Sequence, residues 1–372
     1  MREIIQWFNQ STYIPPLSPA CEMCAQGSKL VLLITGVCPS KCFYCPLSFE
    51  KGGNDCIFAD EWKLDDENDI EKLICEAKYI NANGAGITGG DPLIVWKRTK
   101  KYITLLKDTF GSDFHIHLYT SGVKNGEYII DLVSAGLDEI RFHPIPKHWN
   151  HMDKSPIFTV IKKALRTDTD IAIEIPAIPK MNKEILSLLE WANNLGIKWV
   201  NLNELEYSER NSNSLNSKGY TLKEDISAAV KWSQESAYEI LKISAERGFD
   251  IGIHYCSCSF KDGIQLANRI KRRAKSIAKN YEIITPEGTL LKGVIYSKEK
   301  NSLIMLSESL KHEHNLSDKQ IFLNIKKERI EMEILLLNKI APILTKLGMQ
   351  CYMIEEYPTA DELEVERIPL PI

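Results

Sequence analysis

Short apolar runs rich in β-branched residues alternate with amphipathic helical patterns between residues 28 and 256. The runs predicted to be strands are 30–35, 86–88, 114–119, 139–143, 171–175, 199–203 and 250–254. The intervening helical patterns fall near 68–81, 93–109, 126–135, 155–166, 182–195 and 234–248. This alternation is typical of βα units around a parallel sheet, because each helix returns the chain to the start of the next strand.

The alternation ends near residue 260, so we predict three parts. These are an N-terminal extension with a cysteine pair at 1–27, a barrel-like part at 28–260 and an accessory α+β domain at 261–372. The last part is expected to contain a basic helix, a hairpin formed by 281–284 and 289–296, and a helix near 331–347. A polar, turn-rich segment, residues 207–223, follows a strand end and is either a lid over a site or a mobile surface loop.

Cys38, Cys42 and Cys45 form a C-x3-C-x2-C pattern just after the first predicted strand. Three thiolates on one short loop can hold three irons of a cubane cluster, whereas a [4Fe–4S] centre usually takes four cysteines. The pattern therefore predicts either a distant fourth ligand or an iron that is open to another molecule. The alternatives are a zinc loop, although zinc sites usually show paired C-x2-C units, or unrelated buried cysteines.

The triple resembles the cluster motif of the radical SAM superfamily, in which the open iron binds S-adenosylmethionine (SAM) and an electron releases a 5′-deoxyadenosyl radical. The resemblance spans roughly residues 28–256 and implies an α/β fold, a partial (β/α)6 TIM-like barrel, here followed by the smaller C-terminal α+β domain. It also implies that Tyr44 lies by the adenine. Within the superfamily the chain looks most like a largely archaeal branch related to pyruvate formate-lyase activating enzymes, although the C-terminal domain departs from the short activating enzymes.

A turn, Thr88-Gly-Gly-Asp-Pro92, ends the second predicted strand. It resembles the GGEP motif of the family, whose backbone contacts the methionine amino group of SAM, with Asp91 in place of the usual glutamate. The resemblance implies that Gly89, Gly90 and Asp91 bind SAM, together with Ser121 at the end of the third strand. For Ser121 the alternative is ordinary Ser-Gly turn chemistry.

Polar residues also end the fourth, fifth and sixth predicted strands. Alternation places Arg141 and His143 on one side of their strand, and Asn201 and Asn203 on one side of theirs. Such side chains are costly inside a barrel mouth unless they are paired, and chemistry in TIM-like barrels gathers at these strand ends. We therefore predict contacts with SAM or substrate, and we name His143, Glu174 and Asn203 as catalytic candidates; the alternative is that each is a satisfied polar group.

A second cysteine group consists of Cys21 and Cys24, in a proline-rich segment expected to be extended, and Cys256 and Cys258, just after the last predicted strand. A nearly closed barrel brings its first and last elements together. Four thiolates suffice for tetrahedral zinc or an auxiliary iron–sulfur cluster, and His254 could replace one of them. The alternative is that these are ordinary small residues near a chain crossing.

The composition of the chain indicates the cellular compartment and the partners to expect. Ten cysteines without a visible secretion signal indicate metal ligation in a reducing cytoplasm. No apolar run is long enough to span a bilayer, so no membrane partner is expected. The net charge of −4 gives no general attraction to nucleic acid. Basic residues between 269 and 279 make RNA a possible partner, but a solvated helix face is the favoured interpretation.

These motifs together predict a radical SAM enzyme that holds a [4Fe–4S] cluster and abstracts hydrogen from an unidentified substrate, either a polypeptide or a tRNA. Such chemistry needs an electron donor such as a ferredoxin or flavodoxin. One alternative is a small metabolite enclosed by residues 207–223. Another is a non-catalytic iron–sulfur or zinc protein, which would have no need of a SAM-binding turn.

Overall fold

The computed structural model describes residues 1–225, 227–297 and 300–371. The chain divides into two compact units. The first comprises Met1–Lys78 and Ala82–Leu266, and the second comprises Tyr79–Asn81 and Ala267–Ile372. In the described part of the chain, no helix combines the length and the apolar character that crossing a membrane requires.

The first unit is built on one curved sheet, which has 11 strands within the described residues, in the order β1-β2-β11-β10-β9-β8-β7-β6-β3-β4-β5. Its central strands are parallel. They are β3 (Lys29–Leu33), β6 (Gly84–Thr88), β7 (His115–Thr120), β8 (Glu139–Phe142), β9 (Asp170–Ala177), β10 (Trp199–Glu204) and β11 (Gly252–Cys256). Each overlaps a predicted strand, and the partial TIM-like barrel is confirmed.

Short antiparallel strands extend both edges of this sheet. They are β1 (Ile5–Gln6) and β2 (Thr12–Ile14) beside β11, and β4 (Phe58–Ala59) and β5 (Trp62–Lys63) beside β3. The start of the chain, predicted as an N-terminal extension, therefore adds two strands to one edge of the sheet.

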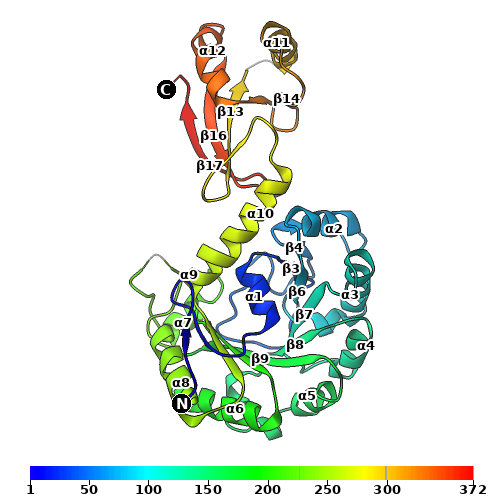
Figure 1. Ribbon diagram of the computed structural model, residues 1–372, viewed down its shortest axis with the longest axis vertical. Helices are drawn as coiled ribbons and strands as arrows, with labels where there is room; N and C mark the ends of the chain where they lie inside the picture. Colours follow the sequence, from blue (N-terminus) through cyan, green and yellow to red (C-terminus); the bar gives the residue numbers. More distant parts are fainter. Residues whose placement is uncertain (226, 298–299, 372) are drawn as a thin grey trace. The chain divides into compact units, whose positions relative to one another are not determined.

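Helices cover the outer face of the curved sheet (Figure 1). They are α2 (Ile70–Tyr79), α3 (Trp96–Phe110), α4 (Ile129–Ser134), α5 (Phe158–Ala164), α6 (Asn182–Leu195) and α8 (Ser233–Arg247). Short 3-10 turns occur at η1 (Pro92–Val95), η2 (Gly126–Tyr128), η3 (Pro146–His148) and η4 (Met152–Lys154). The apolar side of α6 illustrates the packing, because Ile185, Leu188 and Leu189 are all buried.

One helix, α1 (Pro19–Ala25), lies within the curve of the sheet (Figure 1). The prediction of an extended segment here is wrong. The Ser18 hydroxyl accepts a hydrogen bond from the Ala20 backbone N–H, and Pro19 occupies the first turn, where a missing N–H costs nothing. This start signal outweighs the extended bias of the surrounding prolines and places both cysteines of the helix inside the unit.

The second unit contains an antiparallel sheet in the order β14-β15-β13-β16-β17, with β12 paired to β13. Its strands are β12 (Ile283–Ile284), β13 (Leu290–Tyr296), β14 (Ile321–Asn324), β15 (Arg329–Met332), β16 (Gln350–Glu356) and β17 (Glu364–Pro369). Its helices are α10 (Ala267–Ile277), α11 (Lys300–Glu313) and α12 (Ile334–Lys346). The predicted hairpin is confirmed as β12 and β13, whereas α11 was not predicted.

Candidate functional site

A cavity of about 560 Å³ lies inside the first unit. Its walls are formed by the loop after β3, by the inner faces and carboxyl ends of β6 to β11, by α1 and by the π-helical turn η5 (Lys261–Leu266) that follows α9 (Cys258–Phe260). Parallel strands all end at the same edge of such a sheet, so polar residues at their ends converge here.

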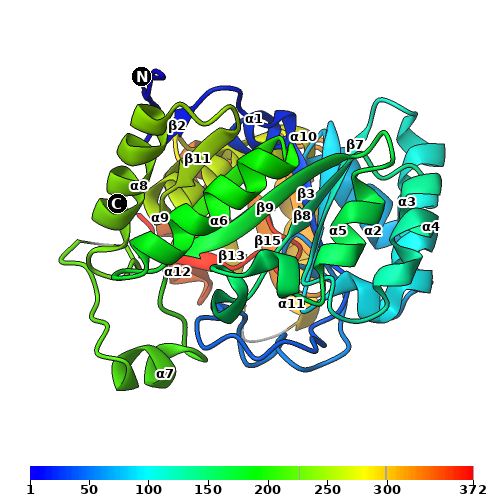
Figure 2. The ribbon, with the colours of Figure 1, turned by 90° about the horizontal axis from the view of Figure 1, so that it is seen from below.

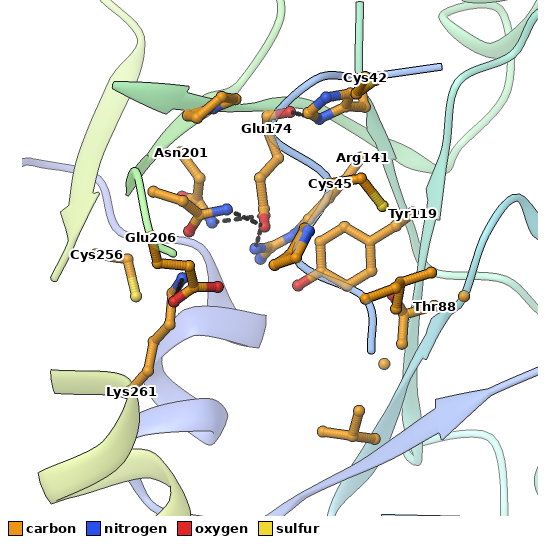
Figure 3. A pocket seen from close by; sticks show the side chains of 18 of the residues that line it. Cys42, Cys45, Thr88, Tyr119, Arg141, Glu174, Asn201, Glu206, Cys256 and Lys261 are labelled. Carbon is orange, nitrogen blue, oxygen red and sulfur yellow. Dashed lines mark hydrogen bonds and ion pairs between the residues drawn. The ribbon is translucent and has the colours of Figure 1, made fainter. Parts of the chain in front are cut away.

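The three cysteines of the C-x3-C-x2-C loop, Cys38, Cys42 and Cys45, all line this cavity. Figure 3 shows Cys42 and Cys45. Burial raises the pKa of Cys38 to about 11 and also raises the pKa of Cys42. Within the described residues, no three His, Cys, Asp or Glu side chains stand as a closed ligand set for a metal ion. The structure therefore brings together the thiols that a cubane cluster uses, but as separate thiols around one cavity.

The Gly-Gly turn supports the start of this loop. The Gly90 backbone N–H donates to the Thr35 carbonyl at 2.6 Å. A Cβ atom on Gly89 would lie 2.2 Å from the Thr35 oxygen, and one on Gly90 would lie 2.2 Å from the Val37 oxygen. Only glycine lets the two backbones approach this closely. Both glycines also line the cavity.

Asp91 is fully buried and holds Ser121, a residue of the cavity wall, by hydrogen bonds. Its carboxylate accepts hydrogen bonds from the Thr120 hydroxyl at 2.7 Å, the Leu93 N–H at 3.1 Å, and both the N–H and the hydroxyl of Ser121. Burial raises the pKa of Asp91, and these hydrogen bonds oppose that shift. Of the four residues predicted to bind SAM, Gly89, Gly90 and Ser121 line the described cavity, and Asp91 is not among its lining residues.

Tyr44 and His143 form a neutral pair on the cavity wall. The Tyr44 hydroxyl lies 2.9 Å from His143 Nε2, and His143 Nδ1 lies 2.7 Å from the Glu174 backbone oxygen. Because a carbonyl oxygen can only accept, Nδ1 carries the proton and Nε2 accepts from the tyrosine. Burial lowers the pKa of His143 and raises that of Tyr44, which keeps both groups uncharged.

The Glu174 carboxylate is held at both oxygens (Figure 3). Oε2 accepts from Arg141 Nη1 at 2.8 Å and from Asn201 Nδ2 at 3.0 Å, while Oε1 accepts from Asn203 Nδ2 at 2.8 Å. Arg141 also donates to Glu139 Oε1 at 2.6 Å. The three predicted catalytic residues all line the cavity, and this network fixes the orientation of the carboxylate among them.

Several cavity residues were missed by the sequence analysis. Lys29 of β3 and both His117 and Tyr119 of β7 face the cavity. Burial lowers the pKa of Lys29 to about 7, and its Nζ lies 2.7 Å from His115 Nδ1. The sequence does contain a pattern that indicates the two β7 residues, because polar residues at every second position of β7 mark one face of a strand.

The second cysteine group is only partly assembled. Cys21 and Cys24 reach the cavity from α1, and Cys256 reaches it from the end of β11. The Cys258 thiol instead donates to the Glu206 carboxylate at 3.5 Å. Of the four predicted ligands, Cys21, Cys24 and Cys256 therefore lie among the described residues that line the cavity, and Cys258 does not.

Comparison with known proteins identifies the family. Residues 32–203 match the family model described as the radical SAM superfamily. Over 363 residues the chain is 40% identical to a Methanocaldococcus jannaschii protein named "Putative glycyl-radical enzyme activating enzyme", covering 95% of this chain and 93% of that protein. The chain belongs to the radical SAM superfamily. It is therefore an enzyme, and membership of this superfamily implies SAM and an iron–sulfur cluster as cofactors.

Further matches each cover part of this radical SAM chain. Residues 288–370 match a domain of unknown function, DUF8061. A Methanopyrus kandleri protein named "Probable GTP 3',8-cyclase" is 29% identical over 107 residues, which is 29% of this chain and 31% of that protein. The crystal structure of Streptococcus suis SuiB bound to S-adenosylmethionine aligns with a TM-score of 0.45 and 10% identity, over 62% of this chain and half the length of SuiB.

Proposed function

We propose that Cys38, Cys42 and Cys45 hold a [4Fe–4S] cluster and that the enzyme cleaves SAM reductively in the adjoining cavity. The observation that carries the proposal is that three thiols from one loop face one cavity of about 560 Å³. A turn that only glycine can form supports the start of this loop. When bound, the cluster supplies the electron that splits the sulfonium of SAM and yields a 5′-deoxyadenosyl radical. A low-potential donor such as a ferredoxin or flavodoxin supplies that electron.

The remaining residues of the cavity bind and orient SAM and the substrate. Gly89 and Gly90 present backbone groups to the methionine end of SAM, and Ser121, oriented by Asp91, offers a hydroxyl. Tyr44 lies beside the cysteines and contacts the adenine. His143, Glu174 and Asn203 form a wall of fixed donors and acceptors that positions SAM and the substrate hydrogen, because each of their hydrogen bonds within the network restricts side-chain rotation.

For the substrate, we propose a glycyl residue of a polypeptide, as the name of the Methanocaldococcus relative states for that protein. The support is that the identity extends over 95% of the chain and so reaches into the second unit as well as the first. Modification of tRNA would instead use the basic residues of α10.

A small zwitterionic metabolite is the second candidate. Glu206 and Lys261 form an ion pair with 3.4 Å between Oε2 and Nζ, on the cavity wall away from Cys45 (Figure 3). A carboxylate and an ammonium side by side match a ligand that carries both charges.

The test uses anaerobically reconstituted protein with dithionite and SAM, and measures 5′-deoxyadenosine and methionine by chromatography. The wild type and a Cys75→Ala control, whose cysteine lies on α2, should form both products, and Cys42→Ala should form neither. A glycyl-radical signal in a co-incubated glycyl radical enzyme would support the polypeptide substrate. Product from small-molecule mixtures alone would support the metabolite, and a cluster-loaded wild type that cleaves no SAM would indicate a non-catalytic protein.

A further inference from the structure

The segment 207–223 is an excursion from the sheet between β10 and α8. Two isolated bridges close its base, because Glu206 pairs with Ala229 and Leu222 pairs with Val230. A short helix, α7 (Ser212–Ser217), lies at its far end. The sequence analysis expected either a lid or a mobile loop here, and the structure shows a folded segment with its own hydrogen bonds.

One buried amide of this segment binds the backbone of the cysteine loop. Asn211 is 3% exposed, and its Nδ2 donates to the Tyr44 carbonyl at 3.2 Å and to the Glu206 carbonyl at 2.9 Å. Tyr44 stands between Cys42 and Cys45, so this single side chain ties the loop to the end of β10. Figure 2 shows α7 on the same side of the unit as the loop, which is drawn in blue.

Further contacts reach both arms of the cysteine loop. The Tyr220 ring stacks on Phe43 with 6.3 Å between centroids and an interplanar angle of 7°, and Lys218 Nζ lies 4.8 Å from the centre of the Phe43 ring. A Cβ atom on Gly52 would lie 1.5 Å from Arg210 Nη1, which means that the guanidinium rests directly on that glycine. Contacts to residues 43, 44 and 52 therefore reach two separate stretches of the loop.

We propose that residues 207–223 form a clamp that holds the cysteine loop in the conformation needed for the iron–sulfur cluster, with Asn211 as its main positioning residue. The loop from Cys38 to Cys56 contains turns and bends but no helix or strand, so contacts from outside add to its few internal hydrogen bonds in fixing its conformation. The Gly-Gly turn supports its start, Arg98 holds Asp55 near its end at 2.7 Å, and the clamp holds residues 43, 44 and 52 between them. This inference rests on the proposed cluster at Cys38, Cys42 and Cys45, because a clamp on the loop matters when the loop carries ligands.

The first test uses metal-free protein and does not depend on the cluster. Lys41 is exposed within the loop, so trypsin cleavage after it reports how often the loop opens. Asn211→Ala should be cleaved about fivefold faster than wild type, the effect expected from losing one net hydrogen bond. Asn213→Ala is the matched control, because Asn213 lies on the exposed side of the same short helix. Equal cleavage rates for the two variants would overturn the clamp.

The second test uses reconstituted protein and follows loss of the visible cluster absorbance on exposure to a chelator. Tyr220→Ala should lose the cluster several-fold faster than wild type, and Tyr220→Phe, which retains the stacked ring, should restore the wild-type rate. Circular dichroism of each variant verifies that the unit is folded. A Tyr220→Ala decay that matches Tyr220→Phe would contradict the clamp.

The two tests separate this inference from the proposed function. If wild-type protein takes up no iron and sulfide, the cluster proposal fails, whereas the trypsin experiment still shows whether Asn211 holds the loop. If wild type takes up a cluster and Asn211→Ala matches Asn213→Ala in cleavage rate, the cluster proposal stands and the clamp is rejected.

Discussion

Replacing Arg141 with methionine should destabilise the first unit by about 3–5 kcal/mol, the usual cost of removing one partner from a buried ion pair. The guanidinium is 2% exposed and donates to Glu139 at 2.6 Å and to Glu174 at 2.8 Å. Glu139 is fully buried, so its carboxylate would lose its cation and keep the Ser18 hydroxyl as a donor at 2.8 Å. The loss should exceed that of a surface pair, which contributes about 0–1 kcal/mol.

Urea unfolding followed by tryptophan fluorescence measures this loss. All seven tryptophans lie at or before residue 232, so the signal reports on the first unit. Arg247→Met is the control, because Arg247 pairs with Glu190 at 3.4 Å with both side chains about half exposed. The double variant Arg141→Met/Glu139→Gln should recover part of the loss, because it removes one stranded charge. A loss below about 1 kcal/mol for Arg141→Met would refute the reasoning.

Three further predictions follow from single groups. Burial lowers the pKa of Lys29 to about 7, so the unfolded state binds more protons at this residue than the folded state between pH 7 and 10.5. The free energy of unfolding of the first unit, measured in urea, should therefore rise by about 1.4 kcal/mol from pH 6 to pH 8. In the Lys29→Met variant this rise should be absent. Burial opposes ionisation of Glu331, yet Lys292 holds its pKa at about 2, so the second unit should lose stability as the pH falls from 4.5 toward 2. Amide hydrogen exchange should show a smaller loss of stability in the Glu331→Gln variant. The same dependence of stability on pH in both proteins would contradict this prediction. Gly90→Ala would place a Cβ atom 2.2 Å from the Val37 oxygen and should lower the iron bound per chain, whereas full iron occupancy would argue against the support role of the turn.

The parallel strands were predictable because strands buried on both faces read as continuous apolar runs. Alternation along the sixth predicted strand put Asn201 and Asn203 on one face, and both line the cavity together with Glu174. Helix α1 was missed, because a single hydroxyl from Ser18 decides its start within a proline-rich segment.

The fourth member of the second cysteine group shows where strand alternation stops being informative. A C-x-C pair on one strand would place both thiols on the same face. The strand β11 ends at Cys256, however, and Cys258 begins the next helical turn, so the second thiol points toward Glu206. The clamp was beyond prediction for a different reason, because Asn211 and Tyr44 are 167 residues apart and only the folded chain brings them together.

The most direct test of the account is the content of iron, sulfide and zinc per chain in anaerobically prepared, reconstituted protein. The account predicts about four irons and four sulfides per chain, lost when Cys38, Cys42 and Cys45 are replaced by alanine; about one additional zinc, or about eight irons in all, would place a metal at the second cysteine group. Wild-type protein that holds no iron and sulfide after reconstitution would contradict the central claim that these three cysteines carry a radical SAM cluster.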